Sequence, residues 1–193
     1  MTSITTTPAT PAQWADVQAA LSGGGDGRSC QCVWPLLRNK DWQATTFEER
    51  EGILNAEITA GPPPGIVAYV DGEAAGWIRI GPRTRQARLA YTRAIAAATS
   101  EPFDDETVWA VTCFSVRREH RGKGLNRALL AAAVDYARRS GARLIEGYPI
   151  DTSKGKTSPN DLYHGALSTF EAAGFTQTGE LRPGRPLVTL ALT

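Results

Sequence analysis

A glycine-rich turn joins a β-rich run directly to an amphipathic helix, and this junction constrains the fold more than any other feature. The turn Arg121–Gly124, which reads Arg-Gly-Lys-Gly, follows a predicted strand over 107–116, and an apolar helical repeat begins at Leu125. Glycines permit a tight turn, and the first turn of a helix adds unpaired N–H groups and a positive dipole end. With a further strand over 142–148, the sequence predicts a β-loop-α-β unit that cradles a phosphate or pyrophosphate.

Two familiar phosphate-binding motifs do not match this turn. A P-loop requires Gly-Lys followed by Ser or Thr, but Leu125 follows Gly124, so no hydroxyl is placed for Mg²⁺. The dinucleotide fingerprint requires a third glycine where this chain has Arg127. A nucleoside triphosphatase or a dehydrogenase is therefore not expected.

The segment Glu119–Gly124 resembles the acetyl-CoA-binding motif of the GNAT superfamily of N-acetyltransferases, Gln/Arg-x-x-Gly-x-Gly/Ala, with Glu119 departing at the first position. Phe170–Phe175 is similar to that family's Tyr-x-x-x-Gly-Phe corner, with Phe170 in place of the tyrosine. The resemblance implies an α/β fold of the α+β type, a twisted, mixed and mostly antiparallel sheet with helices on both faces. It also implies direct transfer of an acetyl group from acetyl-CoA to a primary amine of a small molecule or peptide.

The same resemblance implies a coenzyme site along the end of the strand and the turn. Its residues are Phe114, Ser115, Val116, Arg121, Gly122, Lys123, Gly124, Leu125 and Asn126. Acetyl-CoA is then a cosubstrate, and no metal is needed. Cys-Phe-x-Val at 113–116 and Glu-Gly-Tyr-Pro at 146–149 are similar to an uncharacterised subgroup of the family. Because Glu119 and Phe170 depart from the pattern, a non-catalytic acyl-CoA-binding sensor or interaction module is the alternative.

Acetylation needs a neutral amine, so a general base is useful at neutral pH. Glu146 lies in a predicted buried strand, where a related family of ribosomal-protein alanine acetyltransferases has a similar base-bearing Leu-Glu-Val strand. Burial would tend to raise the pKa of this carboxyl. The alternative is an ion pair of Glu146 with a neighbouring arginine such as Arg143 or Arg79.

The family's general acid is the tyrosine that Phe170 replaces, and a phenyl ring cannot donate a proton. The chain offers other groups for this role, namely Tyr148, Tyr163, Ser168 and Cys113. A thiolate also leaves fairly easily at neutral pH, so the need for an acid is modest.

Cys30-Gln31-Cys32, followed by Trp34, invites a metal or redox interpretation. Two further ligands at a standard zinc spacing are missing, so zinc is not expected. We expect the segment from Cys30 to Leu37 to pack against the sheet or to line an acceptor pocket, with its cysteines acting as small apolar residues.

Composition favours one domain over residues 1–193, with 1–11 as a loose N-terminus. The formal charge of +1 gives no reason to expect nucleic acid, and no run of 18 apolar residues predicts a membrane span. Three cysteines and the lack of a secretion signal favour reduced thiols and a cytoplasmic location. A homodimer is compatible with the sequence, which leaves the oligomeric state open.

Further elements follow from periodicity and turn signals. Helices are predicted over 12–21, 47–59 and 83–98, and a hairpin over 66–80. The glycine run over 22–27 is expected to be a linker, with a substrate-gating loop as the alternative. The insert Ile150 to Asn160 is expected to be an acceptor-selecting lid rather than a solvent-exposed loop.

Overall fold

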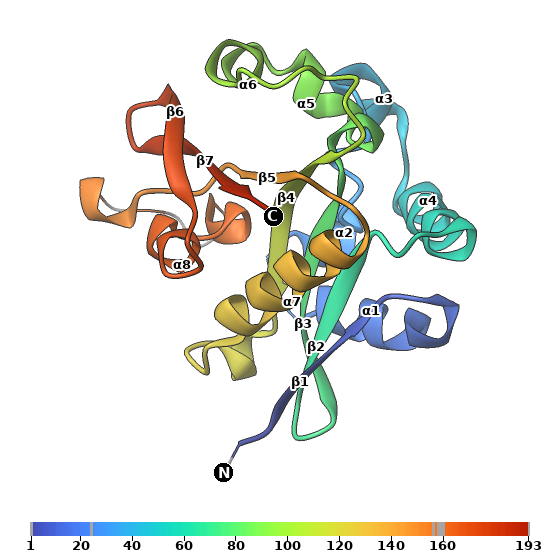
Figure 1. Ribbon diagram of the computed structural model, residues 1–193. Coiled ribbons are helices and arrows are strands. Elements are labelled where there is room, and N and C mark those ends of the chain that lie inside the picture. The colour runs from blue at the N-terminus through green and yellow to red at the C-terminus, as the bar shows by residue number, and fades with distance from the viewer. Residues whose placement is uncertain (1, 24, 156, 158–160, 193) are drawn as a thin grey trace.

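The computed structural model describes residues 2–23, 25–155, 157 and 161–192, and it contains one seven-stranded sheet (Figure 1). The strand order is β1-β2-β3-β4-β5-β7-β6. The pair β4–β5 is parallel and the other named pairs are antiparallel, which confirms the predicted mixed, mostly antiparallel sheet. The strands are β1 (Ile4–Pro8), β2 (Gly65–Val70), β3 (Glu73–Pro82), β4 (Val108–Val116), β5 (Leu144–Gly147), β6 (Thr176–Arg182) and β7 (Arg185–Ala191).

Eight α-helices are found among the described residues. They are α1 (Trp14–Leu21), α2 (Gly27–Cys30), α3 (Asn39–Ala44), α4 (Phe47–Ala60), α5 (Ala87–Tyr91), α6 (Arg93–Ala98), α7 (Leu125–Arg139) and α8 (Leu167–Glu171). The predicted helix over 47–59 is confirmed, and a capping box starts it: Thr46 Oγ1 accepts from the Glu49 N–H, while Glu49 Oε2 accepts from the Thr46 N–H at 2.7 Å. The predicted hairpin is also confirmed, as β2 and β3.

Helices cover both faces of the sheet, and β2 is therefore buried on both sides. Alternate residues of a strand point to opposite faces. Ile66 and Ala68 pack in the core beneath α7, whereas Val67 packs with residues of α1 and α4 on the other face. Figure 1 shows α7 crossing one face while α1 and α4 lie beyond the other. The predicted arrangement of helices on both faces is thus confirmed.

Two predictions about elements are wrong. The N-terminal segment is not loose, because Ile4–Pro8 forms β1 and pairs antiparallel with β2. The segment 83–98 is not one helix but a 3-10 turn followed by α5 and α6, with Thr92 in an extended conformation between them. Long-range contacts decide this break, since Arg83 and Arg88 point inward and donate to the backbone carbonyls of Pro102 and Trp34.

The sheet opens in the middle of β4, and this opening positions the site. The β4–β5 ladder runs only from Val108 to Val111, because β5 ends at Gly147. Against β3, the register shifts so that Arg79 faces Cys113 and Ile80 faces Val111, which leaves Thr112 as a bulge residue. Bulges bend a strand and end pairing. Residues 112–116 therefore present an edge to which β5 does not pair.

In the part of the chain that the structure describes, no helix has the length and the apolar character that a membrane span requires.

Candidate active site

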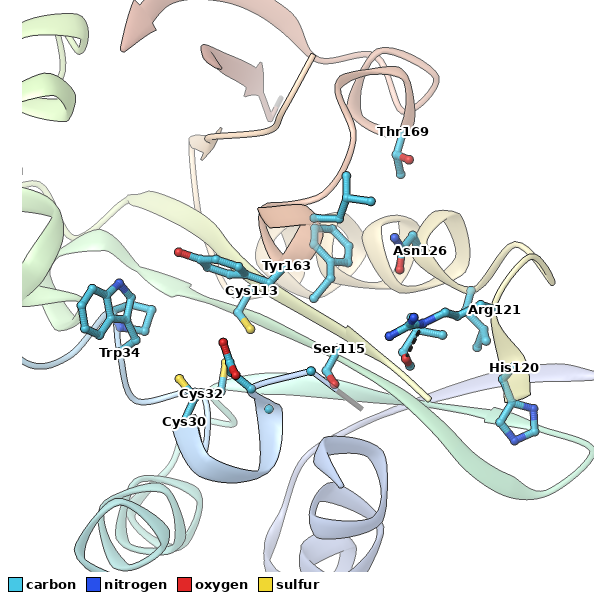
Figure 2. Close-up of a pocket in the computed structure, with 18 of the residues that line it drawn as sticks. Cys30, Cys32, Trp34, Cys113, Ser115, His120, Arg121, Asn126, Tyr163 and Thr169 are labelled. Atoms are coloured by element: carbon cyan, nitrogen blue, oxygen red, sulfur yellow. Dashed lines mark hydrogen bonds between the residues drawn. The ribbon is translucent and has the colours of Figure 1, made fainter. Parts of the chain in front are cut away.

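A cavity of about 710 Å³ lies along the open half of β4. One end is formed by the turn after β4 and the start of α7, and the other by the segment around α2 and by the two tryptophans Trp34 and Trp42. Figure 2 shows Trp34 and the sulfurs of Cys30, Cys32 and Cys113 toward one end, and Arg121 and Asn126 toward the other. A single elongated molecule can therefore contact both ends.

The turn at the first end has the geometry of an anion cradle. Gly122 and Gly124 have φ values of 77° and 84°, which residues with a Cβ rarely adopt. The N–H groups of Arg127 and Ala128 donate to the Gly124 carbonyl at 3.1 and 3.2 Å, so the N–H groups that precede them in the turn have no intrahelical acceptor. Asn126 also lines the cavity, and its Oδ1 atom is buried without a hydrogen-bond partner.

Eight of the nine residues predicted to bind the coenzyme line this cavity. They are Phe114, Ser115, Val116, Arg121, Gly122, Gly124, Leu125 and Asn126. Lys123 does not line it, and its Nζ lies 3.2 Å from Nδ1 of His120. Arg121 donates from Nε to the Val116 carbonyl at 3.4 Å.

The structure argues against Glu146 as the base. Glu146 is fully buried, does not line the cavity, and forms an ion pair with Arg83 at 2.8 Å. Its carboxylate also accepts from Thr99 at 2.5 Å and from the Tyr148 hydroxyl at 2.7 Å. The alternative prediction, that Glu146 forms an ion pair with an arginine, is confirmed, but the partner is Arg83 rather than Arg143 or Arg79. A carboxylate whose oxygens are occupied in this way is not placed to take a proton from a bound amine.

The two tyrosines that the sequence offers as a general acid differ in their access to the cavity. Tyr148 is buried on the Glu146 cluster, and burial together with the Glu146 charge raises its pKa well above the ordinary value. Tyr163 does line the cavity, and burial raises its pKa. Phe170 packs edge-on against Phe114 and Phe175 in the core. Of the two predicted tyrosines, only Tyr163 can contact a ligand in this cavity.

The end opposite the cradle is aromatic and rigid. The rings of Trp34 and Trp42 meet edge to face, with centroids 4.9 Å apart. Arg88 stacks on Trp34 at 3.5 Å and Arg50 on Trp42 at 3.7 Å, measured from the guanidinium carbon to the ring centroid. Stacked guanidinium groups hold the indole rings in place. These tryptophans favour a ligand with apolar or aromatic surface.

Three cysteines line the same end of the cavity: Cys30, Cys32 and Cys113. Burial raises the pKa of Cys30 to about 11. Burial also acts to raise the pKa of Cys32, but a hydrogen bond with Cys113 and the charge of Arg79 outweigh it and lower the value to about 7. The expectation that this segment lines a pocket fits the structure, and Cys32 also packs as a small apolar residue in a buried hydrophobic cluster, as expected.

The glycine run has a place in the cavity wall. Gly25, Asp26 and Gly27 line the cavity, a position that fits the alternative of a substrate-gating loop better than a linker. The lid predicted over 150–160 lies partly outside the described residues, since 156 and 158–160 are not described.

One group of three potential metal ligands occurs among residues 2–23, 25–155, 157 and 161–192. It consists of Glu73, Glu119 and His120. Glu73 and Glu119 both form ion pairs with Arg117, so these carboxylates already have a cationic partner.

Sequence analysis missed several residues of the cavity wall. Trp42, His120 and Thr169 all line it. They come from different elements, and neither spacing nor a motif links them to the cradle. Only the tertiary structure shows that these residues line the same cavity as Trp34 and the turn before α7.

Comparisons with known proteins agree with this fold. The model of the acetyltransferase (GNAT) family matches residues 32–149. An acetyltransferase of the GNAT family from Streptococcus pneumoniae is similar, with 17% identity, a TM-score of 0.56, and coverage of 99% of this chain and 100% of that chain. The PaiA N-acetyltransferase from Thermoplasma acidophilum in complex with coenzyme A has 11% identity, a TM-score of 0.56, and coverage of 98% and 99%.

A third structure, yncA from Salmonella typhimurium with its cofactor acetyl-CoA, has 19% identity, a TM-score of 0.54, and coverage of 98% of this chain and 94% of that chain. A comparison with curated proteins found no match. Because the family model covers more than half of the sequence, the chain belongs to the GNAT family of acetyltransferases. Its class is that of an acetyl-CoA-dependent acyltransferase.

Proposed function

We propose that this protein transfers an acetyl group from acetyl-CoA to the primary amine of a small molecule or peptide that carries an apolar or aromatic group. One observation carries the proposal: a single cavity joins the anion cradle before α7 to the wall formed by Trp34, Trp42 and the cysteines. Donor and acceptor can therefore enter from opposite ends and meet beside β4.

The cradle suits the pyrophosphate of coenzyme A. Backbone N–H groups at a helix start and the nearby Arg121 offer donors and positive charge to a phosphate. The free edge of residues 112–116 offers backbone groups to the amide-bearing arm of the coenzyme. From Val116 to Cys113, an extended chain covers about 10 Å. The structures of yncA with acetyl-CoA and of PaiA with coenzyme A support this assignment.

The opposite end suits an amine with apolar surface. Trp34 and Trp42 offer ring faces and edges, and the exposed Asp26 supplies a carboxylate in the same wall. An alkyl ammonium group is attracted to a carboxylate, whereas its apolar body gains from contact with aromatic rings. This combination favours hydrophobic amines over polar ones such as sugars.

The test is a calorimetric titration with acetyl-CoA, with ATP as the control because it shares phosphates but not the pantetheine arm. We expect micromolar binding of acetyl-CoA and much weaker binding of ATP. Release of free coenzyme A thiol would then be measured with a panel of aromatic, aliphatic and polar amines. Binding without transfer to any amine would favour the acyl-CoA sensor, and absence of binding would refute the proposal.

A further inference from the structure

The charged side chains of the cavity wall are separated by sign. The arginines Arg121 and Arg127 belong to the cradle end, and among the described residues Asp26 is the only carboxylate that lines the cavity. Arginines suit the phosphates of a coenzyme, whereas a carboxylate suits a nitrogen that acquires positive charge. Because Glu146 is enclosed by Arg83 and lies outside this wall, Asp26 is the acidic side chain there that a bound amine can meet.

Asp26 lies near the middle of the cavity wall. The next residue, Gly27, packs so closely on β4 that a Cβ there would meet the Leu21 carbonyl oxygen at 2.7 Å and Ser115 Oγ at 3.2 Å. Figure 2 shows Ser115 between the cysteine sulfurs on one side and Arg121 on the other. A coenzyme bound at the cradle and an amine held by the tryptophans meet in this stretch of the wall.

The loop that carries Asp26 is tied to its surroundings on both sides of this residue. On one side, the Arg118 N–H donates to the Gly23 carbonyl at 3.0 Å, which joins the loop to the segment after β4. On the other side, the Asp26 carbonyl accepts from the Cys30 N–H at 2.7 Å and from Ser29 Oγ at 3.1 Å. A backbone that is held in this way keeps a functional side chain close to one position.

The carboxylate of Asp26 is not used by the fold. Asp26 is the N-cap of α2, where an aspartate commonly accepts from a backbone N–H, but its side chain makes no such bond. The ion pairs among the described residues do not include it either. Glu73 and Glu119 differ in this respect, because both pair with Arg117. The oxygens of Asp26 are thus available to a ligand.

Two other titratable groups of the wall are less suited to accept a proton. His120 has a charged neighbour at each ring nitrogen, with Lys123 Nζ 3.2 Å from Nδ1 and Glu73 Oε2 3.6 Å from Nε2. Burial raises the pKa of Tyr163, so its hydroxyl keeps its proton at neutral pH and does not act as a base.

We propose that Asp26 is a catalytic residue whose carboxylate accepts the proton that the amine loses as the amide forms. This inference rests on the proposed function and assigns the base of that reaction. The neutral amine nitrogen forms a bond to the acetyl carbonyl carbon and acquires positive charge, which the nearby carboxylate stabilises. A proton passes from this nitrogen to Asp26, the bond from carbon to the coenzyme sulfur breaks, and the electron pair leaves on sulfur.

Solvent restores the base after each transfer. Asp26 is exposed, so its carboxyl group gives the proton to water and returns to the carboxylate. The coenzyme leaves as a thiolate and takes up a proton from water, so atoms and charges balance without a second protein group. This route needs no tyrosine at the position of Phe170, whose ring packs against Phe114 and Phe175.

The test compares Asp26→Asn with the wild type, using the best amine of the panel and the hydrazide with the same apolar body. An alkyl amine is mostly protonated at pH 7, whereas a hydrazide is neutral. A general base contributes about 10²–10⁴-fold, so we expect kcat with the amine to fall by that factor in Asp26→Asn. With the hydrazide kcat should fall as well, and the calorimetric affinity for acetyl-CoA should be unchanged.

Asp41→Asn is the matched control, because Asp41 is exposed on α3 next to Trp42 but does not line the cavity. This variant should keep the wild-type kcat. If Asp26→Asn raised only KM for the charged amine and left kcat and the hydrazide reaction intact, Asp26 would merely attract the ammonium group, and its role as base would be overturned. Wild-type protein that binds no acetyl-CoA or acetylates no amine would instead refute the proposed function, so the two failures are distinguishable.

Discussion

Two buried arginines each form an ion pair with a glutamate, and the surroundings of the two pairs differ. Arg83 pairs with Glu146, and both side chains are fully buried. Arg79 pairs with Glu57, whose side chain is 22% exposed. Each guanidinium keeps an Nε without a partner. Arg83 lies against the ring of Phe103, whereas Arg79 lies beside Cys32 in the cavity wall.

The comparison teaches that a buried charge is not by itself a sign of catalysis. The Glu146 carboxylate is occupied by Arg83, Thr99 and Tyr148, so its charge has no free oxygen to offer a ligand. Arg79 instead lies near Cys32, a thiol that borders the cavity, and its charge acts to lower the pKa of that thiol. A buried charged or titratable group can take part in catalysis only if a ligand can reach it, however strong its ion pair is.

The largest effect is expected from Glu146→Gln. Removing one partner of a buried ion pair leaves the other charge uncompensated, which costs about 3–5 kcal/mol. Chemical denaturation should show this loss, while turnover per folded molecule should stay near the wild-type value. Glu57→Gln is the matched control, and it should cost less because water reaches that site. A stable Glu146→Gln protein without turnover would return the role of base to Glu146.

The next effect is expected from Gly124→Val at the cradle. A Cβ at Gly124 would meet nothing within 4 Å, so the cost comes from its φ of 84°. We expect the affinity for acetyl-CoA in calorimetry to fall by about tenfold or more, since the strain is worth roughly 1–2 kcal/mol. Gly72→Val is the control, because Gly72 has a φ of 86° and equal space but lies in the β2–β3 turn. Equal loss of affinity in both variants would contradict the cradle.

A smaller effect is expected on the pH dependence of alkylation at Cys32. The thiolate is the reactive form, so the rate with iodoacetamide should rise as the pH increases through about 7. The groups that face this sulfur are Cys30, Cys113 and Arg79, with Trp77 as a neutral donor. In Arg79→Met the midpoint should move to higher pH, and the rate at pH 7 should fall by about tenfold for each unit of that shift. An unchanged midpoint would remove Arg79 from the activation of Cys32.

The smallest effect is expected from Thr46→Ala, which removes the N-cap of α4, the helix that carries Glu57. The loss of the hydrogen bond to the Glu49 N–H should lower the free energy of unfolding by about 1 kcal/mol. The reactivity of Cys32 toward iodoacetamide should be unchanged, because the cap lies three helical turns from Glu57. A large change in that reactivity would mean that the Arg79–Glu57 pair depends on the whole helix.

The sequence predicted those parts of the fold that local signals determine. The glycines at 122 and 124, the capping box at Thr46 and the alternation around the 71–72 turn each act over a few residues. The N-terminal strand was missed because a short threonine-rich run becomes a strand only when β2 offers it an edge. The break within 83–98 was missed because the inward side chains of Arg83 and Arg88 find distant carbonyl groups.

In the candidate site, too, some features follow from local sequence and others depend on the tertiary structure. By itself the sequence determined the cradle, because a strand, two glycines and an amphipathic helix in succession specify their own local geometry. Only the tertiary structure decided that Glu146 is enclosed by Arg83 and that Cys32 lies beside Arg79, 47 positions away by number in the chain. The physical reason is that the reactivity of a carboxylate or a thiol depends on burial and on nearby charges, and these are fixed by strand register and packing rather than by sequence neighbours.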